Sequence, residues 1–307
     1  MPDTNFFKTK PFEHQSEALH VGWNLPEFGY FMEMGTGKSK VLIDNLGMLY
    51  QSEQIDFALI IAPKGVYRNW VAKEIPEHMS EQVPHRVIRW VSGPNKKQAE
   101  EMRSVKDKFE GLTIFVMNVE SFSTVRGQKA GQWLSRAFGP KGMIAIDEST
   151  TIKNPKAKRT KSLIKIADGF KFRRLLTGSP VTKSPMDIFA QFEFLRQGLL
   201  GFESFYGFQG RYAIMNKVKM GAAAFNQIVG FRNLDDLNNR VDRYTFRVLK
   251  KDCLDLPEKI YTSRYVGLTQ DQHKMYQQIK EHAMVVLGDM DFVTAPMVIT
   301  QLLRLQQ

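Results

Sequence analysis

Apolar and polar positions alternate in two different rhythms along the first two thirds of the chain. Short apolar runs occur at residues 29–32, 57–62, 113–117, 142–146 and 172–176, with a weaker one at 87–91. The segments between them carry apolar residues at helical spacing, at residues 38–50, 66–75, 97–109, 131–138 and 158–167. Short buried strands that alternate with helices predict an α/β fold with a doubly wound parallel sheet flanked by helices.

The rhythm changes near residue 198. Just before it, Ser-Pro-Met-Asp at 184–187 has the residue types of a helix start and predicts a helix that ends near residue 196. The alternation is lost at 199–257, where we expect helices and loops. A strand-like run at 260–266 precedes residues with capping-box spacing at 269–272, which predict a helix to about residue 287. Residues 295–307 also have a helical apolar stripe, so the fold should end in a helical C-terminal extension.

Composition narrows the class of protein. Of the 307 residues, 43% are hydrophobic, and 43 Lys and Arg against 32 Asp and Glu give a net charge of +11. This excess permits nucleic acid, anionic membranes or acidic proteins as partners. The only cysteine, Cys253, excludes an internal disulfide and a cysteine-rich zinc site. Because no apolar run reaches the roughly 20 residues of a membrane span, we expect no membrane partner and a cytoplasmic location, with the nucleus or a virus-infected cell's cytoplasm as alternatives.

A glycine-rich segment follows the first apolar run and opens a helix-like segment. It consists of Met34, Gly35, Thr36, Gly37, Lys38 and Ser39. In this context glycines let backbone N–H groups approach phosphate oxygens, a lysine reaches the outer phosphates and a serine ligates magnesium. The first glycine of the usual pattern is absent, since Met32 stands in its place. The segment predicts a binding site for ATP and Mg²⁺ with Lys38 as a catalytic residue.

Two adjacent acids end the apolar run at 142–146. Neighbouring residues at a strand end point in different directions, so one carboxylate can hold a metal ion while the other acts on water. We assign Asp147 to magnesium, together with Ser39, and Glu148 to the attacking water. An acidic pair alone is usually a solvated turn, and the phosphate-loop pattern upstream favours the catalytic interpretation.

The two motifs together resemble the first motor lobe of helicase-superfamily-two ATPases, and within them the Swi/Snf family of double-stranded DNA translocases. Further matching segments follow in the family's order, at residues 12–15 (FEHQ), 60–64 (IIAPK), 69–70 (NW), 147–155 (DESTTIKNP), 176–180 (LTGSP) and 252–257 (DCLDLP), with 268–270 and Tyr276 beyond them. The resemblance implies a RecA-like motor lobe at 1–198, an extension and linker at 199–257, and the incomplete beginning of a second lobe at 258–307.

The resemblance also implies roles for individual residues. Gln15 would read the adenine edge and Phe12 would pack on the base. Pro63 and Lys64 would lie on the DNA-facing edge, and Thr177, Gly178 and Ser179 would couple the nucleotide state to DNA contact. Taken one at a time, these residues have ordinary structural explanations: Gln15 as a surface helix residue, Pro63 as the end of a strand and residues 177–180 as a turn. Only their occurrence in the family's order favours the functional roles.

The chain departs from the family in two places. Ser149 and Thr150 stand where the family usually has Ala-His, whose histidine links the nucleotide to the 176–180 segment; the Thr150 hydroxyl is a candidate substitute. Only 48 residues follow Lys259, too few for a second lobe with its arginine finger, and Arg304 lacks that motif around it. We therefore expect weak turnover by this chain and a separate or missing second lobe as partner.

Ten basic side chains and one acid, Asp168, occupy residues 151–183. The ten are Lys153, Lys156, Lys158, Arg159, Lys161, Lys165, Lys171, Arg173, Arg174 and Lys183. Such a run is often only a solvated helix face, but here it joins the acidic motif to the 176–180 segment. Few aromatics interrupt it, which favours phosphate-backbone contact over base stacking. We predict a DNA-binding surface that includes Lys153, Lys156, Lys158 and Arg159.

Three other functions stay open at this point. One is a single-strand DNA or RNA helicase, because duplex specificity comes from the resemblance alone. A second is a P-loop kinase or signalling NTPase, disfavoured because no segment resembles a phosphoacceptor site. The third is a nucleotide-gated nucleic-acid-binding module without turnover of its own.

Overall fold

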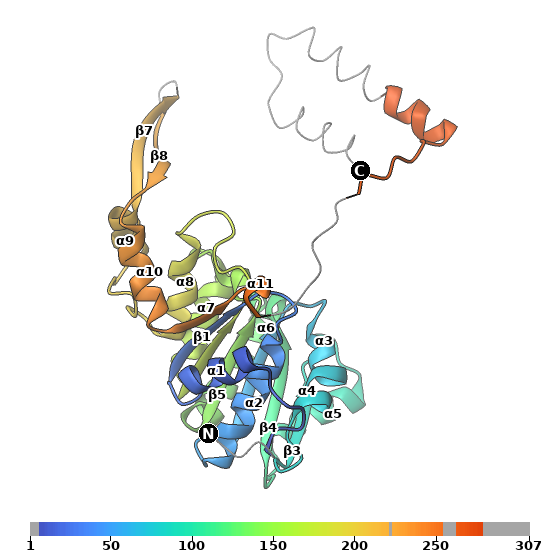
Figure 1. The fold of residues 1–307 in the computed structure, drawn as a ribbon. Helices are drawn as coiled ribbons and strands as arrows, with labels where there is room; N and C mark the ends of the chain where they lie inside the picture. Colours follow the sequence, from blue (N-terminus) through green and yellow to red (C-terminus); the bar gives the residue numbers. More distant parts are fainter. Residues whose placement is uncertain (1–5, 221–222, 254–261, 279–307) are drawn as a thin grey trace. The chain divides into compact units, whose positions relative to one another are not determined.

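The computed structural model describes residues 6–220, 223–253 and 262–278. The chain divides into two compact units, Met1–Asp255 and Leu256–Gln307. Nearly all described secondary structure belongs to the first unit (Figure 1).

The first unit is built on a seven-stranded, fully parallel sheet with the strand order β3-β4-β2-β5-β6-β1-β9. The strands are β1 Glu27–Met32, β2 Phe57–Ala62, β3 His85–Arg89, β4 Leu112–Asn118, β5 Gly142–Asp147, β6 Phe172–Leu176 and β9 Thr245–Val248. From β1 the chain crosses to β2, continues to β3 at one end of the sheet, returns to β4, and adds β5 and β6 between β2 and β1 before β9 joins on the other side of β1. The strands are parallel and helices lie on both faces, so the predicted doubly wound α/β fold is confirmed. All five strong apolar runs and the weaker one are strands of this sheet.

Helices cover both faces of the sheet (Figure 1). They are α1 Glu13–Gly22, α2 Lys38–Gln51, α3 Tyr67–Asn69, α4 Ile75–His78, α5 Lys96–Arg103, α6 Val125–Phe138, α7 Lys158–Ala167, α8 Asp187–Leu195, α9 Phe205–Tyr212, α10 Leu234–Asp242 and α11 Lys250–Cys253. A π-helical turn, Trp70–Glu74, joins α3 to α4. The helices predicted before residue 198 are therefore confirmed, with the second one divided by this turn.

Strand alternation explains why the sheet is covered on both sides. In β2, Leu59 and Ile61 pack into one hydrophobic core with α6, α7 and α8, while Ala58 and Ile60 pack into the other with α1, α2 and α4. Every residue of β2 is buried. A strand that is apolar on both faces produces a continuous apolar run, as the sequence pattern indicated.

The prediction of helices and loops at 199–257 is partly wrong. The helices α9, α10 and α11 lie there, but so do three strands. Two of them, β7 Ala213–Met220 and β8 Ala223–Phe231, form a separate antiparallel hairpin, and β9 joins the main sheet beside β1. The hairpin has polar and apolar residues on each strand, with residues 214–217, 226 and 227 exposed, and β9 is a short, half-buried edge strand, so neither produces a strong apolar signal.

Three predicted elements fall in the second unit. The capping box is confirmed: the Thr269 hydroxyl accepts from the Gln272 backbone N–H, the Gln272 side chain accepts from the Thr269 N–H, and a helix begins at Gln270. The strand-like run is not a strand over its described part, residues 262–266. Residues 260–261, 279–287 and 295–307 lie outside the described residues, and the three-part domain division stays a prediction.

No helix among the described residues is long and apolar enough to cross a membrane.

Candidate nucleotide and nucleic-acid site

The predicted site residues follow four neighbouring strands at one edge of the sheet. Because all strands are parallel, their carboxyl ends meet at this edge, where ligands of doubly wound sheets bind. The phosphate loop follows β1, Lys64 follows β2, the acidic pair ends β5 and Thr177 follows β6. The topology therefore brings together segments that are more than 100 residues apart in sequence.

The loop between β1 and α2 has the backbone of a phosphate cradle. Gly35 and Gly37 both have φ of +87°, a conformation that strongly favours glycine. A Cβ at Gly37 would also lie 2.2 Å from the amide nitrogen of Gln15. Lys38 begins α2, whose first N–H groups have no intrahelical acceptor and carry the positive end of the helix dipole. The loop thus presents backbone donors and one lysine to the same space.

Helix α1 holds this loop from one side. Gln15, 2% exposed, donates to the Thr36 carbonyl at 3.0 Å and accepts from the Phe12 N–H at 3.1 Å. His14 Nε2 lies 2.8 Å from the same carbonyl and donates to it, since a carbonyl only accepts. Phe12 is 63% exposed and free to cover a base. Sequence reasoning missed His14, although it lies inside the motif that contains Phe12 and Gln15.

Asp147 lies at the end of β5 and is almost completely buried. Its Oδ2 accepts a 2.9 Å hydrogen bond from the indole Nε1 of Trp70, which belongs to the π-helical turn. Burial raises the pKa of Asp147 above its ordinary value, the Trp70 hydrogen bond opposes this rise and the neighbouring Glu148 adds to it. Trp70 therefore orients the carboxylate, a role that its place in the Asn-Trp match did not reveal.

Glu148 has left-handed backbone angles, φ 51° and ψ 62°, which are unfavourable for a residue with a Cβ. This conformation turns its side chain toward the phosphate loop, where Glu148 Oε1 lies 3.9 Å from Lys38 Nζ. The Lys38 side chain is 10% exposed and that of Glu148 36%. Two of the three predicted catalytic side chains, Lys38 and Glu148, thus form an ion pair across the site.

The donor set fits magnesium and a nucleotide phosphate. Asp147 offers a fixed, buried carboxylate and Ser39 a hydroxyl in the first turn of α2, which are the oxygen ligands that Mg²⁺ prefers. A magnesium ion at such a site commonly takes only two protein ligands, with waters and phosphate oxygens completing its shell. Accordingly, no group of three or more His, Cys, Asp or Glu side chains suited to a metal ion forms within residues 6–220, 223–253 and 262–278.

A cleft of about 820 Å³ opens beside the loop, between α1 and the β9–α11 segment. Phe12 and His14 line one side, and Phe246 and Val248 the other. At its margin the Lys250 backbone N–H donates to Glu33 Oε2 at 2.7 Å, and Lys250 Nζ would lie 3.4 Å from a Cβ built on Gly35. Lys250 therefore brings a second cation to the phosphate loop. Sequence reasoning missed it, because nothing local relates residue 250 to residue 35.

A hydrogen-bonded link connects the acidic motif to the 177–180 segment. The Ser149 hydroxyl donates to Gln191 Oε1 at 2.6 Å, and Gln191 Nε2 donates to the Pro180 carbonyl at 2.8 Å. Ser149 and Gln191 are fully buried. Thr150 is the candidate that the sequence offered for the histidine's place, whereas the hydroxyl in this link belongs to its neighbour Ser149. The buried amide on α8 is the part of the link that sequence reasoning missed.

A second connection lies four residues earlier on α8. Asp187 accepts hydrogen bonds from Thr182 and from the Lys183 N–H, and lies 3.6 Å from Lys153 Nζ. Burial by itself would raise the pKa of Asp187, but these hydrogen bonds hold it below its ordinary value. Lys153 also donates to the Thr182 hydroxyl. Its charge is therefore partly used inside the protein.

The remaining predicted DNA-contact residues differ in accessibility. Lys64 is exposed and its N–H donates to the Glu120 carboxylate at 3.1 Å, with Pro63 half-buried before it. Ser179 is exposed and Gly178 lies against the phosphate loop, where its Cβ would be 3.1 Å from the Met34 nitrogen. The Thr177 side chain is buried and accepts from the Ser179 N–H. Thr177 thus shapes the segment and does not present its hydroxyl to a ligand.

The basic segment at 151–183 is not one surface. Lys156, Lys158, Lys161, Lys165, Lys171 and Lys183 are exposed, and Lys153, Arg159 and Arg173 are half-buried. Arg174 is completely buried and donates to the carbonyls of Gly22, Trp23, Pro26 and Arg173 and to Asn45 Oδ1. Since α7 runs back across the sheet, Lys171 precedes the start of β6 at the opposite edge. Our expectation that much of the segment flanks the site is therefore correct only for its two ends.

Comparisons with known proteins identify relatives of this chain. The sequence profile described as the SNF2-related domain matches residues 30–307. An uncharacterized ATP-dependent helicase of Mycoplasma genitalium is 26% identical over 276 residues, 89% of this chain and 24% of that protein. Protein CHROMATIN REMODELING 24 of Arabidopsis thaliana is 22% identical over 291 residues, 88% of this chain and 25% of the relative. The chain thus spans about a quarter of the length of these curated relatives.

The fold has a counterpart among solved structures. The Sulfolobus solfataricus SWI2/SNF2 ATPase core, in complex with double-stranded DNA, aligns with all of this chain and 59% of that one, with a TM-score of 0.60 and 22% identity.

Proposed function

Because the chain belongs to the SNF2-related domain family, we propose that its first unit is the ATP-binding lobe of a motor that couples ATP hydrolysis to movement along duplex DNA. The observation that carries this proposal is the approach of the phosphate-loop lysine to the acidic pair, with Lys38 Nζ 3.9 Å from Glu148 Oε1 and Asp147 oriented by Trp70. Phosphoryl transfer needs a cation that binds the phosphates and a residue that positions the attacking water. Lys38 and Glu148 bring these two groups into one site.

Each side chain has a separate task in this proposal. The α2 N–H groups and Lys38 bind the phosphates, and Ser39 and Asp147 would hold a magnesium ion, which neutralises phosphate charge when bound. Glu148 orients the attacking water and accepts its proton. When phosphates draw Lys38 away, Glu148 loses its ion-pair partner and becomes available to that water. The resting ion pair thus keeps the base occupied until a nucleotide binds.

The proposed DNA surface lies at the same sheet edge. It comprises Lys64, Lys156, Lys158, Arg159 and Ser179, with Lys153, Pro63 and Gly178 behind them. These groups offer cations and a hydroxyl but few aromatic rings, so binding should depend on phosphates and vary little with sequence. Counterion release then predicts that duplex affinity falls steeply with salt.

ATP turnover by this chain, with and without duplex DNA, tests the proposal. We expect turnover stimulated by duplex and lowered at least about 100-fold by Lys38→Ala, which removes charge stabilisation of the transition state. We also expect the rate to rise where a second lobe supplies an arginine, because such a residue contributes several orders of magnitude in related mechanisms. Binding of ATP that is unaffected by Lys38→Ala would contradict the assigned site.

The same assay separates the nucleic-acid substrates. Stimulation by duplex DNA over single-stranded DNA and RNA of equal length is the expected result. Stronger stimulation by either single strand would replace the duplex assignment with a single-strand helicase. Duplex binding that responds to ATP without any turnover would indicate a nucleotide-gated module.

A further inference from the structure

The β7–β8 hairpin stands apart from the main sheet and has no role in the nucleotide site. Figure 1 shows it extending away from the body of the first unit, beyond α9 and α10. Its strands pair antiparallel over eight residue pairs, with one irregularity between Ile214 and Met215. An isolated two-stranded ribbon is marginally stable, so the molecule must hold this one from its root.

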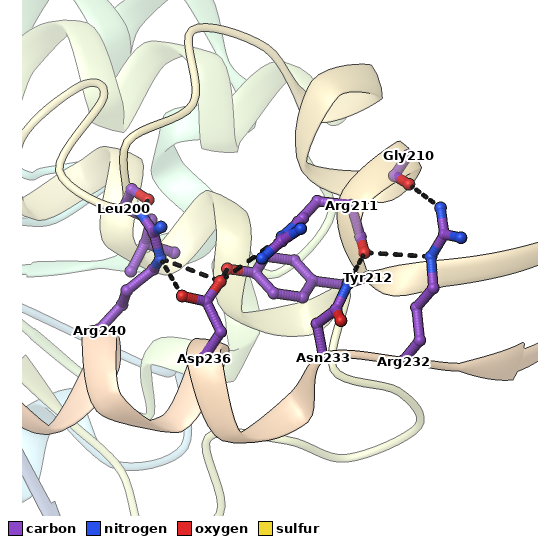
Figure 2. A network of polar contacts seen from close by, with 8 residues as sticks. All are labelled: Leu200, Gly210, Arg211, Tyr212, Arg232, Asn233, Asp236 and Arg240. Atoms are coloured by element: carbon purple, nitrogen blue, oxygen red, sulfur yellow. Dashed lines mark hydrogen bonds and ion pairs between the residues drawn. The ribbon is translucent and has the colours of Figure 1, made fainter.

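A polar network fixes the root (Figure 2). Asp236 of α10 accepts from the Tyr212 hydroxyl at 2.8 Å and from Arg240 Nε at 3.2 Å, and lies 3.7 Å from Arg211 Nε. Where the hairpin ends, Arg232 donates to the carbonyls of Gly210 and Arg211. Both strand ends are thus tied to helices of the first unit.

Aromatic packing fixes the same root from inside. Tyr212 and Phe208 are completely buried. Phe208 packs against Phe189 of α8 and against Phe202, with ring centroids 5.3 and 5.5 Å apart. Because α8 also carries Gln191 and Asp187, the hairpin is rooted on the helix that holds the 177–183 segment. The hairpin is therefore a projection with a rigid base.

All charged side chains in and beside the hairpin are basic. Residues 204–234 contain four basic side chains, Arg211, Lys217, Lys219 and Arg232, and no acid, although the whole chain has 32 acids in 307 residues. In the register Lys217 faces Asn226 and Asn216 faces Gln227, and these four side chains are exposed. Exposed cations and amides without competing carboxylates suit phosphate oxygens.

We propose that the β7–β8 hairpin is a second duplex-binding element, which contacts the phosphate backbone through Lys217 and its neighbouring amides. This rests on the proposed function, because it assumes that the first unit binds duplex DNA. Duplex is favoured over a protein partner because the exposed polar side chains described on the hairpin, Asn216, Lys217, Asn226 and Gln227, are positive or neutral. A two-stranded ribbon also has dimensions that a DNA major groove accepts. The hairpin would extend the contact beyond the sheet edge.

Charge reversal tests this element. The variants are Lys217→Glu and Lys217→Glu with Lys219→Glu, measured with a labelled 30-base-pair duplex over a series of salt concentrations. We expect affinity to fall about 5- to 10-fold for the single change, and the slope of log affinity against log salt to decrease by about one for each phosphate that the protein no longer neutralises. Lys108→Glu is the matched control, since Lys108 is a fully exposed lysine outside both proposed surfaces.

A third variant guards against local misfolding. Lys217→Gln removes the charge but keeps a polar strand residue, and it should lower the salt slope while ATP affinity stays at the wild-type value. Unchanged duplex affinity and slope in all three variants would overturn the hairpin proposal and leave the sheet-edge surface intact. If the wild-type chain itself does not bind duplex, the proposed function fails, and the hairpin proposal with it.

Discussion

The phosphate loop and the basic segment at 151–183 both concentrate positive charge, but they hold it in different ways. In the loop, the charge comes from backbone N–H groups at the start of α2 and from Lys38, and two glycines at φ +87° fix their position. In the segment, long side chains carry the charge, and burial decides the task of each. Lys156 remains on the surface, whereas the buried Arg174 guanidinium donates its hydrogen bonds to carbonyl oxygens inside the protein. The position of the charge in the loop is predictable from a short motif. In the segment, the task of each charged side chain depends on its burial, which the sequence does not reveal.

The largest expected effect concerns the loop side of this comparison. Glu148→Gln removes the proposed base and the ion pair to Lys38 while keeping the shape of the side chain. We expect turnover to fall by about 10²- to 10⁴-fold, and ATP to bind at least as tightly, because Lys38 no longer has a competing carboxylate. Measurement of duplex-stimulated turnover beside fluorescent-nucleotide binding checks both. Asp147→Asn should instead weaken magnesium-dependent binding, so identical behaviour of the two variants would refute the separate roles.

The next effect concerns the buried end of the basic segment. Arg174→Met removes the five hydrogen bonds that the buried guanidinium donates to four carbonyls and to Asn45 Oδ1, and a hydrogen bond from a charged group contributes roughly 1.5–3 kcal/mol. We expect the free energy of unfolding to fall by about 3 kcal/mol or more, while Lys158→Met on the surface should change it little. Urea unfolding followed by tryptophan fluorescence suits this test, since all four tryptophans lie in the first unit. A small loss for Arg174→Met would mean that the donors these carbonyls already have, such as the Asn45 amide for Trp23 and the Arg173 N–H for Pro26, are sufficient.

The elements that were predictable from the sequence leave local signals. The six apolar runs and the first helices were predictable because strands buried on both faces and periodic helices each have a characteristic spacing of apolar residues. The phosphate loop and the acidic pair were predictable because their geometry depends on a few consecutive residues. The contact between Lys38 and Glu148 followed from topology, since parallel strands bring their carboxyl ends together.

The parts that could not be predicted depend on contacts between distant residues. Gln191 occupies an apolar helix, and only the approach of Ser149 and Pro180 shows why an amide is buried there. Lys250 and Trp70 have the same character, because each acts on a residue far away in sequence. The hairpin was missed for a different reason: residues 214–217, 226 and 227 of its strands are exposed, and they show no clear apolar period.

A smaller effect divides the basic segment itself. Lys156→Glu with Arg159→Glu changes the end beside the acidic motif, and Lys165→Glu with Lys171→Glu changes the end near the start of β6. We expect the first pair to weaken duplex binding about 10-fold on unrelated sequences and the second less than about 2-fold, because only nearby charges release counterions. Fluorescence anisotropy at several salt concentrations measures both. Equal losses would restore the single-surface interpretation, and losses that vary with DNA sequence would contradict backbone contact.

The smallest effect concerns the link from the acidic motif to the 177–180 segment. Ser149→Ala removes the hydroxyl that donates to Gln191, a neutral hydrogen bond worth about 1 kcal/mol, or about 5-fold in an equilibrium. If the link transmits the nucleotide state, stimulation of turnover by duplex should fall by up to this factor while ATP affinity and stability change less. The readout is the ratio of stimulated to basal turnover.

Ser149→Thr serves as the rescue variant, because it keeps the hydroxyl that Gln191 Oε1 accepts from. Gln191→Leu should act in the same direction as Ser149→Ala but more strongly, since it also leaves the Pro180 carbonyl without its donor. A merely structural link would lower basal and stimulated turnover together and leave their ratio unchanged. The ratio therefore distinguishes a buried hydrogen bond that only stabilises α8 from one that replaces the missing histidine.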